Sequence, residues 1–194
     1  MTRIQYQLIH WLQRLRQIKF NLLSDCRNVE GHPIIHQPAQ FVGKGKISFR
    51  EKVHLGFFPS PHFLSGYIYI EARNENSVIE IGDHVWMNNN TYLISAGPGI
   101  SIGRETMLGL NCEIIDSDFH HTHPEKRKDG NPKTGRVVIG ENVLIGSNVK
   151  ILKGVHIGNN CIIANGSVVT RSFGENRIIY GNPAKGGYGL VADA

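Results

Sequence analysis

The sequence contains little cysteine and no long apolar run, and each of these shortages excludes a class of protein. Only three cysteines occur in 194 residues, at positions 26, 112 and 161. An odd number at such wide spacing provides neither a disulfide framework nor a CxxC metal knuckle. No apolar run approaches the roughly 18 residues of a membrane span, and no signal-peptide pattern follows Met1. We therefore expect a cytoplasmic protein.

The overall composition is that of a folded globular protein. Hydrophobic residues make up 40% of the chain and charged residues 19%, which argues against disorder. The formal net charge of +5 favours anionic partners such as phosphates. The sequence has no stacking motif and no Lys/Arg-rich helix typical of nucleic-acid binding, so nucleic acid is not an expected partner.

A six-residue period organises the second half of the chain. From residue 139 it reads IGENVL IGSNVK ILKGVH IGNNCI IANGSV VTRSFG, and earlier come IGDHVW MNNNTY and IGRETM LGLNCE. The first position is always aliphatic or Met: Ile81, Met87, Leu93, Ile102, Leu108, Ile114, Ile139, Ile145, Ile151, Ile157, Ile163 and Val169. Short strands that alternate with tight corners explain this pattern, and they stack as a parallel β-solenoid in which each coil buries the next.

The second and fifth positions of the units support the same architecture. The fifth is small or β-branched at Val85, Thr91, Thr106, Cys112, Val143, Val149, Val155, Cys161 and Ser167. The second is often Gly, as expected where a chain turns tightly at a corner. Cys112 and Cys161 occupy the small inward slot, so we interpret both as packing residues and not as reactive groups.

The pattern [LIV]-G-x-x-[STVC]-x resembles the hexapeptide-repeat acyltransferases. This resemblance implies an all-β fold, a left-handed parallel β-helix of triangular cross-section, and a homotrimer. We expect the β-helix over residues 78–174, with a protruding loop at 116–136. An N-terminal amphipathic helical segment (1–31) and irregular first coils or a cap (32–77) precede it. The tail, 175–194, contains YGNPAKGGYGL, which is similar to the family's closing G-x-P-A-[KR] segment and would close the coenzyme A site.

Residues 3–23 are predicted to form a helix with a single apolar stripe. Six residues at spacings of three and four form the stripe: Ile4, Leu8, Trp11, Leu15, Ile18 and Leu22. We expect this helix to pack on the end of the solenoid or on a neighbouring subunit. The alternative is a basic amphipathic helix on an anionic membrane surface, which would place the protein at the inner face of the membrane.

The segment before the regular repeats contains two strand-like stretches, FVGKGKISF and YIYIEA, and the loop FFPSPHF. Solenoid ends need capping, which explains most of this segment. Aromatic side chains on a loop also suit the faces of sugars, and Arg73, just after the segment, would meet an anionic acceptor.

The stretch DSDFHHTHPEKRKDG interrupts the period between Ile114 and Ile139. The step is 25 residues, one more than four repeats, so we expect a loop of roughly 20 residues in place of one coil, a length typical of functional loops. His120 falls six residues after Ile114, where the period requires an aliphatic residue, and such violations mark functional sites. A metal site at His120, His121 and His123 is disfavoured because three ligands within four residues do not easily surround a tetrahedral ion. A solvated loop is the remaining alternative.

DSDFH also resembles the segment that carries the catalytic histidine in sugar O-acetyltransferases of this superfamily. The resemblance implies that His120 is a general base that takes a proton from an acceptor hydroxyl, with Asp116 or Asp118 orienting its ring. His123 is expected to gate the site or contact the acceptor. Asn88, in MNNNT, matches an asparagine that holds the sugar in galactoside-type relatives, although the three asparagines equally suit a ladder of corner residues.

The same resemblance implies acetyl-CoA as co-substrate and no metal. Gly146 and Ser147 in IGSN, and Asn165 in ANGS, fall where the family uses main-chain groups along the pantetheine arm. A backbone N–H near Gly146 or Ser147 would stabilise the oxyanion. Arg171 in VVTRS and Lys185 in NPAK fall where the family places cations near the nucleotide phosphates, although both also suit solvated charges at the end of the repeats.

These observations together predict an acetyl-CoA-dependent O-acetyltransferase. Its acceptor would be a sugar hydroxyl of a cell-surface polysaccharide, capsule or O-antigen, or of its precursor. Three alternatives stay open: N-acetylation of an amino-sugar nucleotide or an antibiotic on the same fold, a metalloprotein similar to the γ-class carbonic anhydrases, and a non-catalytic solenoid that only binds ligands.

Overall fold

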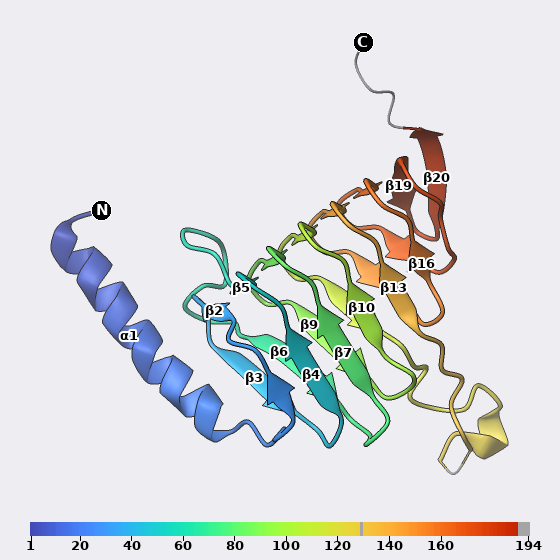
Figure 1. Cartoon of the computed structure of the whole chain (residues 1–194), viewed down its shortest axis with the longest axis horizontal. Helices are drawn as coiled ribbons and strands as arrows, with labels where there is room; N and C mark the ends of the chain where they lie inside the picture. Colours follow the sequence, from blue (N-terminus) through green and yellow to red (C-terminus); the bar gives the residue numbers. More distant parts are fainter. Residues whose placement is uncertain (129, 190–194) are drawn as a thin grey trace.

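The computed structural model describes residues 1–128 and 130–189, which form a triangular solenoid with a helix at its N-terminal end (Figure 1). Consecutive strands from β1 to β18 enter three sheets in turn. Sheet A contains β1 (Val29–Glu30), β4 (Lys46–Phe49), β7 (Val78–Ile81), β10 (Ile100–Ile102), β13 (Val137–Ile139) and β16 (His156–Ile157). Sheet B contains β2 (Ile34–Ile35), β5 (His54–Leu55), β8 (Trp86–Met87), β11 (Met107–Leu108), β14 (Leu144–Ile145), β17 (Ile162–Ile163), β19 (Arg177–Gly181) and β20 (Ala184–Gly189). Sheet C contains β3 (Ala39–Val42), β6 (Ile68–Ala72), β9 (Tyr92–Ser95), β12 (Glu113–Ile115), β15 (Lys150–Ile151) and β18 (Val168–Val169).

The core consists of the inward positions that the period predicts. All twelve first-position residues are at most 3% exposed, and the nine small fifth-position residues are equally buried. Parallel pairing keeps them in register, so that Ile81, Ile102 and Ile139 stack on one another across sheet A. Burial raises the pKa of the Cys112 thiol to about 11, so this cysteine stays protonated at neutral pH. Both repeat cysteines fill the small slot, as predicted.

The corners explain why the second position favours glycine. A Cβ added to Gly109 would lie 2.7 Å from the carbonyl carbon of Gly146 and 2.7 Å from the nitrogen of Ser147, both in the next coil. Close approach of stacked corners, and not the turn itself, therefore excludes a side chain. Asparagines with positive φ follow at these corners, and their amides form ladders such as Asn111 to Asn148 at 3.1 Å.

The solenoid begins earlier than the regular period indicates. Strands β1 to β3 and β4 to β6 form coils before residue 78, so most of segment 32–77 belongs to the β-helix itself. Ile47, Leu55 and Ile68 supply buried inward residues without the hexapeptide spacing. Only the loop at 56–66 leaves the coil, and Phe63 within it is buried.

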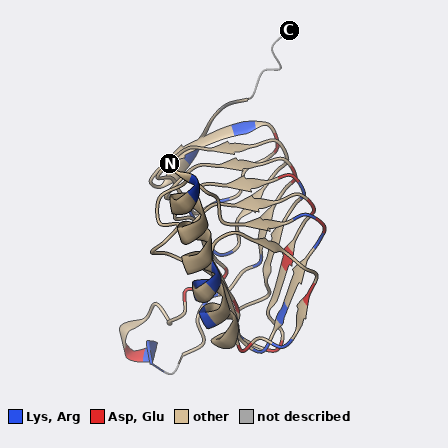
Figure 2. Ribbon diagram, turned by 90° about the vertical axis from the view of Figure 1, so that its left-hand side faces the viewer, with Lys and Arg blue, Asp and Glu red and all other residues tan. Residues whose placement is uncertain are grey.

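Helix α1 (Arg3–Leu22) begins with a capping box formed by Thr2 and Gln5, and lies across the first coil (Figure 2). Its polar face contacts the solenoid: buried Gln13 donates to the carbonyl oxygen of Phe63 at 2.6 Å, and Arg16 donates to the carbonyls of Phe63 and Gly66. These loop carbonyls need donors, which an apolar face cannot supply. The helix therefore packs on the end of the solenoid, as expected, but through its polar face, so that the predicted apolar stripe faces away. No helix of the described residues is long and apolar enough to cross a membrane.

The excursion loop (residues 116–136, of which Asp129 lies outside the described residues) is inserted at the corner between sheets C and A. It contains the 3₁₀ helix η1 (Pro124–Lys126) and is closed at its base by a bridge between Ser117 and Thr134. Strand β12 pairs with both β9 and β15, and β13 pairs with both β10 and β16. No coil is replaced, because β13 supplies the next inward residue. The expectation that His120 takes an aliphatic slot is therefore wrong.

Candidate active site

His120 lies exposed on the excursion loop. Its Nδ1 is 3.2 Å from the carbonyl oxygen of Arg127, across the loop. A carbonyl oxygen only accepts, so this contact holds the proton on Nδ1 and leaves Nε2 as the basic nitrogen. The preceding turn is fixed by Phe119, whose positive φ of 58° is supported by a bond from its N–H to the Ser117 hydroxyl. The loop thus presents one imidazole in the tautomer that a base requires.

Asp116 does not orient this imidazole. Its carboxylate is fully buried and accepts hydrogen bonds from the Ser95 hydroxyl and from the backbone N–H groups of Ala96, Gly97 and Gly99, at 2.7–3.2 Å. These donors saturate both oxygens. In this structure Asp116 has a structural role instead of the expected one. Its carboxylate accepts from backbone N–H groups of a tight turn that would otherwise have no hydrogen-bond partner.

Asp118 is also engaged elsewhere. Its carboxylate pairs with Lys153 at 2.6 Å, which links the loop to the corner after β15. In the described residues, neither aspartate carboxylate hydrogen-bonds the His120 ring, and the Arg127 carbonyl takes the place predicted for a carboxylate.

Of two further residues predicted to contact the acceptor, Arg73 has a paired side chain, whereas the side chain of His123 is exposed. His123 precedes η1, and its backbone N–H donates to Nδ1 of His121 at 3.0 Å. Arg73 donates from Nε to the Glu71 carboxylate at 2.6 Å and lies over the Phe119 ring at 4.9 Å. Arg73 therefore joins the base of the excursion loop to sheet C and is not beside the aromatic loop, as its place in the sequence had implied.

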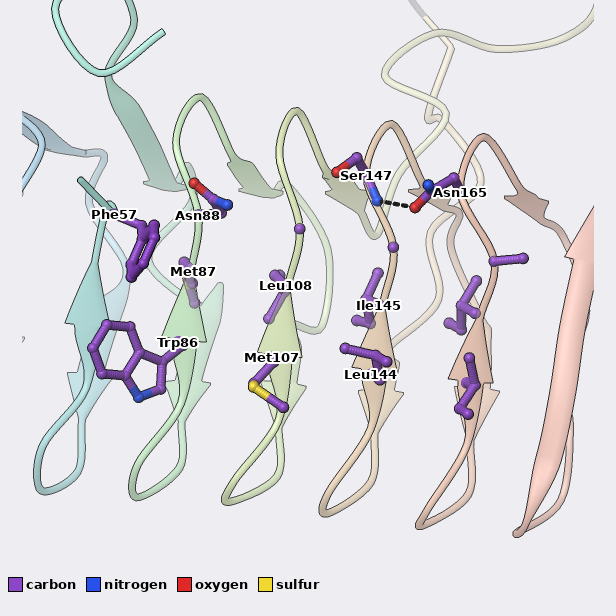
Figure 3. A pocket seen from close by; sticks show the side chains of 15 residues that line it. Phe57, Trp86, Met87, Asn88, Met107, Leu108, Leu144, Ile145, Ser147 and Asn165 are labelled. Atoms are coloured by element: carbon purple, nitrogen blue, oxygen red, sulfur yellow. Dashed lines mark hydrogen bonds between the residues drawn. The ribbon is translucent and has the colours of Figure 1, made fainter. Parts of the chain in front are cut away.

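A groove of about 730 Å³ runs along the outer face of sheet B (Figure 3). Its floor is apolar and comes from the outward residues of successive strands, and its rim follows the corners that lead to sheet C. The lining includes four of the predicted site residues, Asn88, Gly146, Ser147 and Asn165. The structure therefore brings the predicted acceptor asparagine and the predicted pantetheine residues together in one groove.

The coenzyme end of this groove differs in detail from expectation. The N–H of Ser147 donates to Oδ1 of Asn165 at 2.7 Å, and the N–H of Gly146 donates to the Ile163 carbonyl at 2.8 Å. Both N–H groups predicted as oxyanion donors therefore have partners within this chain. Asn165 also approaches Gly146 closely, since a Cβ there would lie 2.3 Å from its Oδ1.

The three consecutive asparagines have three different roles. Asn89 is buried and binds the 57–61 loop, donating to carbonyl oxygens of Phe57 and Pro61. Asn90 joins the corner ladder through Asn111 at 2.8 Å. Asn88, in contrast, is half-buried on the groove rim, so it alone is placed to contact a ligand.

The N-terminal end of the groove is aromatic. The His54 ring stacks on Trp86 at 3.6 Å, and Nε2 of His36 lies 3.0 Å from Nδ1 of His54. Phe57, from the loop predicted to face sugars, meets Trp86 edge-on and is exposed, whereas Phe63 from the same loop is buried under α1. A flat, apolar surface beside Asn88 suits the face of a sugar ring.

This stack should make the first coils sensitive to acid. Burial lowers the pKa of His36 and of His54 below the ordinary 6.5, so the unfolded chain binds more protons as the pH falls through 6.5. The folded protein is therefore most stable above about pH 6.5, and it loses stability as the pH falls toward the lower pKa values that the two histidines have in the folded state. Melting curves at about pH 7.5 and 5.5 should show a larger loss for the wild type than for a His36→Gln/His54→Gln variant. Equal losses would contradict the prediction.

The two predicted phosphate-binding cations lie at the C-terminal end of the solenoid. The Arg171 guanidinium, after β18, lies over the Phe173 ring at 5.2 Å, and Lys185 is exposed on β20 opposite Tyr180. The last part of the predicted tail, 190–194, lies outside the described residues. No group of three His, Cys, Asp or Glu side chains in the described chain is close enough to hold a metal ion.

The structure does not unite the base with the groove within one chain. Asn88 follows β8 at the corner between sheets B and C, whereas His120 follows β12 at the corner between sheets C and A. Two corners of the triangle are separated by a full sheet. Sequence reasoning had assigned both to one site without distinguishing the corners.

Comparison with known proteins supports the repeat architecture. Residues 136–171 match the family described as bacterial transferase hexapeptide (six repeats). The chain is 32% identical over 192 residues to a putative lipopolysaccharide biosynthesis O-acetyl transferase, WbbJ, of Escherichia coli K12, covering 93% of this chain and 89% of that relative. It is 35% identical over 121 residues to a galactoside O-acetyltransferase of Lactococcus lactis, covering 62% of this chain and 56% of the relative. The chain thus spans about half the length of some curated relatives that it matches.

The fold has solved counterparts. A hexapeptide-repeat acetyltransferase of Vibrio cholerae in complex with acetyl-CoA superposes with a TM-score of 0.61 at 19% identity, covering 98% of this chain and 92% of that one. The fold is therefore the left-handed parallel β-helix of these enzymes. With the near-complete match to WbbJ, the chain belongs to the hexapeptide-repeat acetyltransferases.

Proposed function

We propose that this protein transfers the acetyl group of acetyl-CoA to a sugar hydroxyl of a cell-surface polysaccharide, capsule or O-antigen, or of its precursor. The observation that carries this proposal is the groove on sheet B, which joins Asn88 and an aromatic surface at one end to Ser147 and Asn165 at the other. The relative that matches almost the whole chain is named as a lipopolysaccharide biosynthesis enzyme, which favours such an acceptor. We place the reaction in the cytoplasm.

The working enzyme is proposed to be a homotrimer with active sites between copies. The groove floor includes Met107 and Leu144, which are 48% and 45% exposed, and apolar side chains in a row of this kind favour contact with another surface. Because His120 and Asn88 lie at different corners, the excursion loop of one copy would complete the groove of the next. Each site would then combine the base of one chain with the groove of its neighbour.

In this site His120 would act as the general base. Its Nε2 takes the proton from the acceptor hydroxyl while that oxygen attacks the thioester carbonyl, and the Arg127 carbonyl stabilises the imidazolium through Nδ1–H. The C–S bond of the thioester then breaks, and the imidazolium gives its proton to the departing thiolate of coenzyme A. Acetyl-CoA supplies an acyl group that is already activated, so no nucleophilic side chain is needed. The buried Cys112, whose pKa is raised to about 11, is unsuited to such a role.

Arg171 and Lys185 are proposed to bind the phosphates of coenzyme A. An Arg171→Ala/Lys185→Ala variant should raise the KM for acetyl-CoA by about tenfold or more, because charge-assisted contacts of roughly 1.5–3 kcal/mol are lost, while kcat changes little. Arg50→Ala, which removes an exposed cation just after β4, provides the control. An unchanged KM in the double variant would show that both are only solvated charges.

The proposed reaction is tested by thiol release from acetyl-CoA with a panel of acceptors. Hydroxyl-bearing oligosaccharides of capsule and O-antigen type should support turnover, and amino sugars with a blocked amine should remain acceptors. Turnover with amine acceptors alone would instead assign N-acetylation. Coenzyme A binding in calorimetry with no turnover on any acceptor would contradict the proposal.

A further inference from the structure

Helix α1 presents an apolar face to solvent although its opposite face is bound to the solenoid. The six residues of the stripe predicted from the sequence are all exposed, from 48% at Leu15 to 79% at Leu22. On the other side, Gln13 and Arg16 fix the helix through carbonyl oxygens of the 56–66 loop. The helix is therefore held in an orientation that leaves its apolar stripe exposed in this chain.

The charges of the helix lie along both edges of this stripe. At about 100° per residue, Arg14 lies on one side of the line through Leu8 and Leu15, and Lys19 lies on the other. Arg3 adds to the Arg14 side, and all three are exposed. The sequence of α1 contains no Asp or Glu. Figure 2 shows basic and no acidic residues along the helix.

We infer that this face of α1 docks on the surface of an anionic phospholipid membrane. An apolar stripe with Trp11 at its centre, flanked by cations on both sides, is the arrangement by which a helix lies in the interfacial plane of a bilayer. The same face of a second copy is a poorer occupant, because two such faces bring only positive charges together. The inference concerns location and is independent of the catalytic proposal.

The position of α1 supports this occupant. The helix crosses the first coil at the end of the solenoid, whereas the sheet B groove and the excursion loop lie along its sides (Figure 1). Docking through α1 therefore leaves the groove open.

The inference is tested with the full chain and sedimented vesicles. Vesicles of equal parts phosphatidylcholine and phosphatidylglycerol should bind the protein at least about tenfold more tightly than phosphatidylcholine alone, and salt should weaken this binding. Tryptophan emission should shift to the blue on binding. Trp11→Phe should remove most of that shift while keeping the affinity, because Trp86 lies in the groove.

A matched pair of variants decides the role of the stripe. Leu15→Glu should lower vesicle binding by more than about tenfold, because a charge enters the apolar face. Lys52→Gln, which changes the net charge equally at an exposed corner away from α1, should reduce it only slightly. Wild-type binding by Leu15→Glu, or no vesicle binding at all, would overturn the inference. A change in the mass of the assembly on Leu15→Glu without vesicle binding would assign the face to another copy.

Discussion

His120→Ala is expected to lower acetyl transfer by about 100- to 10,000-fold, the range that a general base contributes, with the melting temperature and coenzyme A affinity unchanged. The side chain is exposed and its one hydrogen bond in the described residues, to the Arg127 carbonyl, lies within the loop. Its removal therefore costs little stability. Steady-state thiol release gives kcat, and calorimetry with coenzyme A measures binding separately.

The control for this experiment is His156→Ala. His156 is exposed on the outer side of β16 in sheet A, so it matches the substitution without touching the loop or the groove. It should retain wild-type turnover. If His120→Ala kept most of its activity, His120 would not be the base, and the excursion loop would have only a gating or structural role.

The predictable part of the fold is the part that depends on burial. An inward position repeated every six residues must be filled by an aliphatic side chain in every coil, and the sequence shows this directly from Ile81 to Val169. The first coils lack that spacing because β3, β4 and β6 have four or five residues and the 56–66 loop interrupts the second coil. Their inward residues, such as Ile47 and Ile68, follow the strand alternation instead.

The groove also has a signal in the sequence that was not used. The sixth position of the repeats points outward, and it is apolar at Trp86, Met107, Leu144 and Ile162, which all belong to sheet B. The sixth positions that fall in sheet C before the end of the repeats include Glu113 and Lys150. Reading every third unit together therefore distinguishes the apolar face from the polar ones.

Features that depend on hydrogen bonding between distant segments were not predictable. The stripe of α1 indicates a helix, but the side that contacts the solenoid is set by the carbonyls of Phe63 and Gly66, some fifty residues away. The partner of His120 likewise depends on how the loop folds back to Arg127. Spacing along the chain contains no information on either contact.

Asp116→Ala is expected to destabilise the protein by more than about 3 kcal/mol, because it removes a buried acceptor from one hydroxyl and three backbone N–H groups. For a chain of this size each kcal/mol lowers the melting temperature by about 2–4 °C, so a fall of about 6–12 °C should be observed. Thermal denaturation followed by circular dichroism measures it.

Asp118→Ala is the matched control, since it removes a carboxylate two residues away whose only side-chain partner in the described residues is the half-exposed Lys153. Such a pair contributes about 1 kcal/mol or less. The contrast separates two roles for Asp116. A large fall in melting temperature follows if the carboxylate ties the 95–99 turn to the base of the excursion loop, where the backbone of Asp116 also accepts from Gly135. An unchanged melting temperature with lost turnover would return Asp116 to the catalytic role that its place beside His120 in the sequence had indicated.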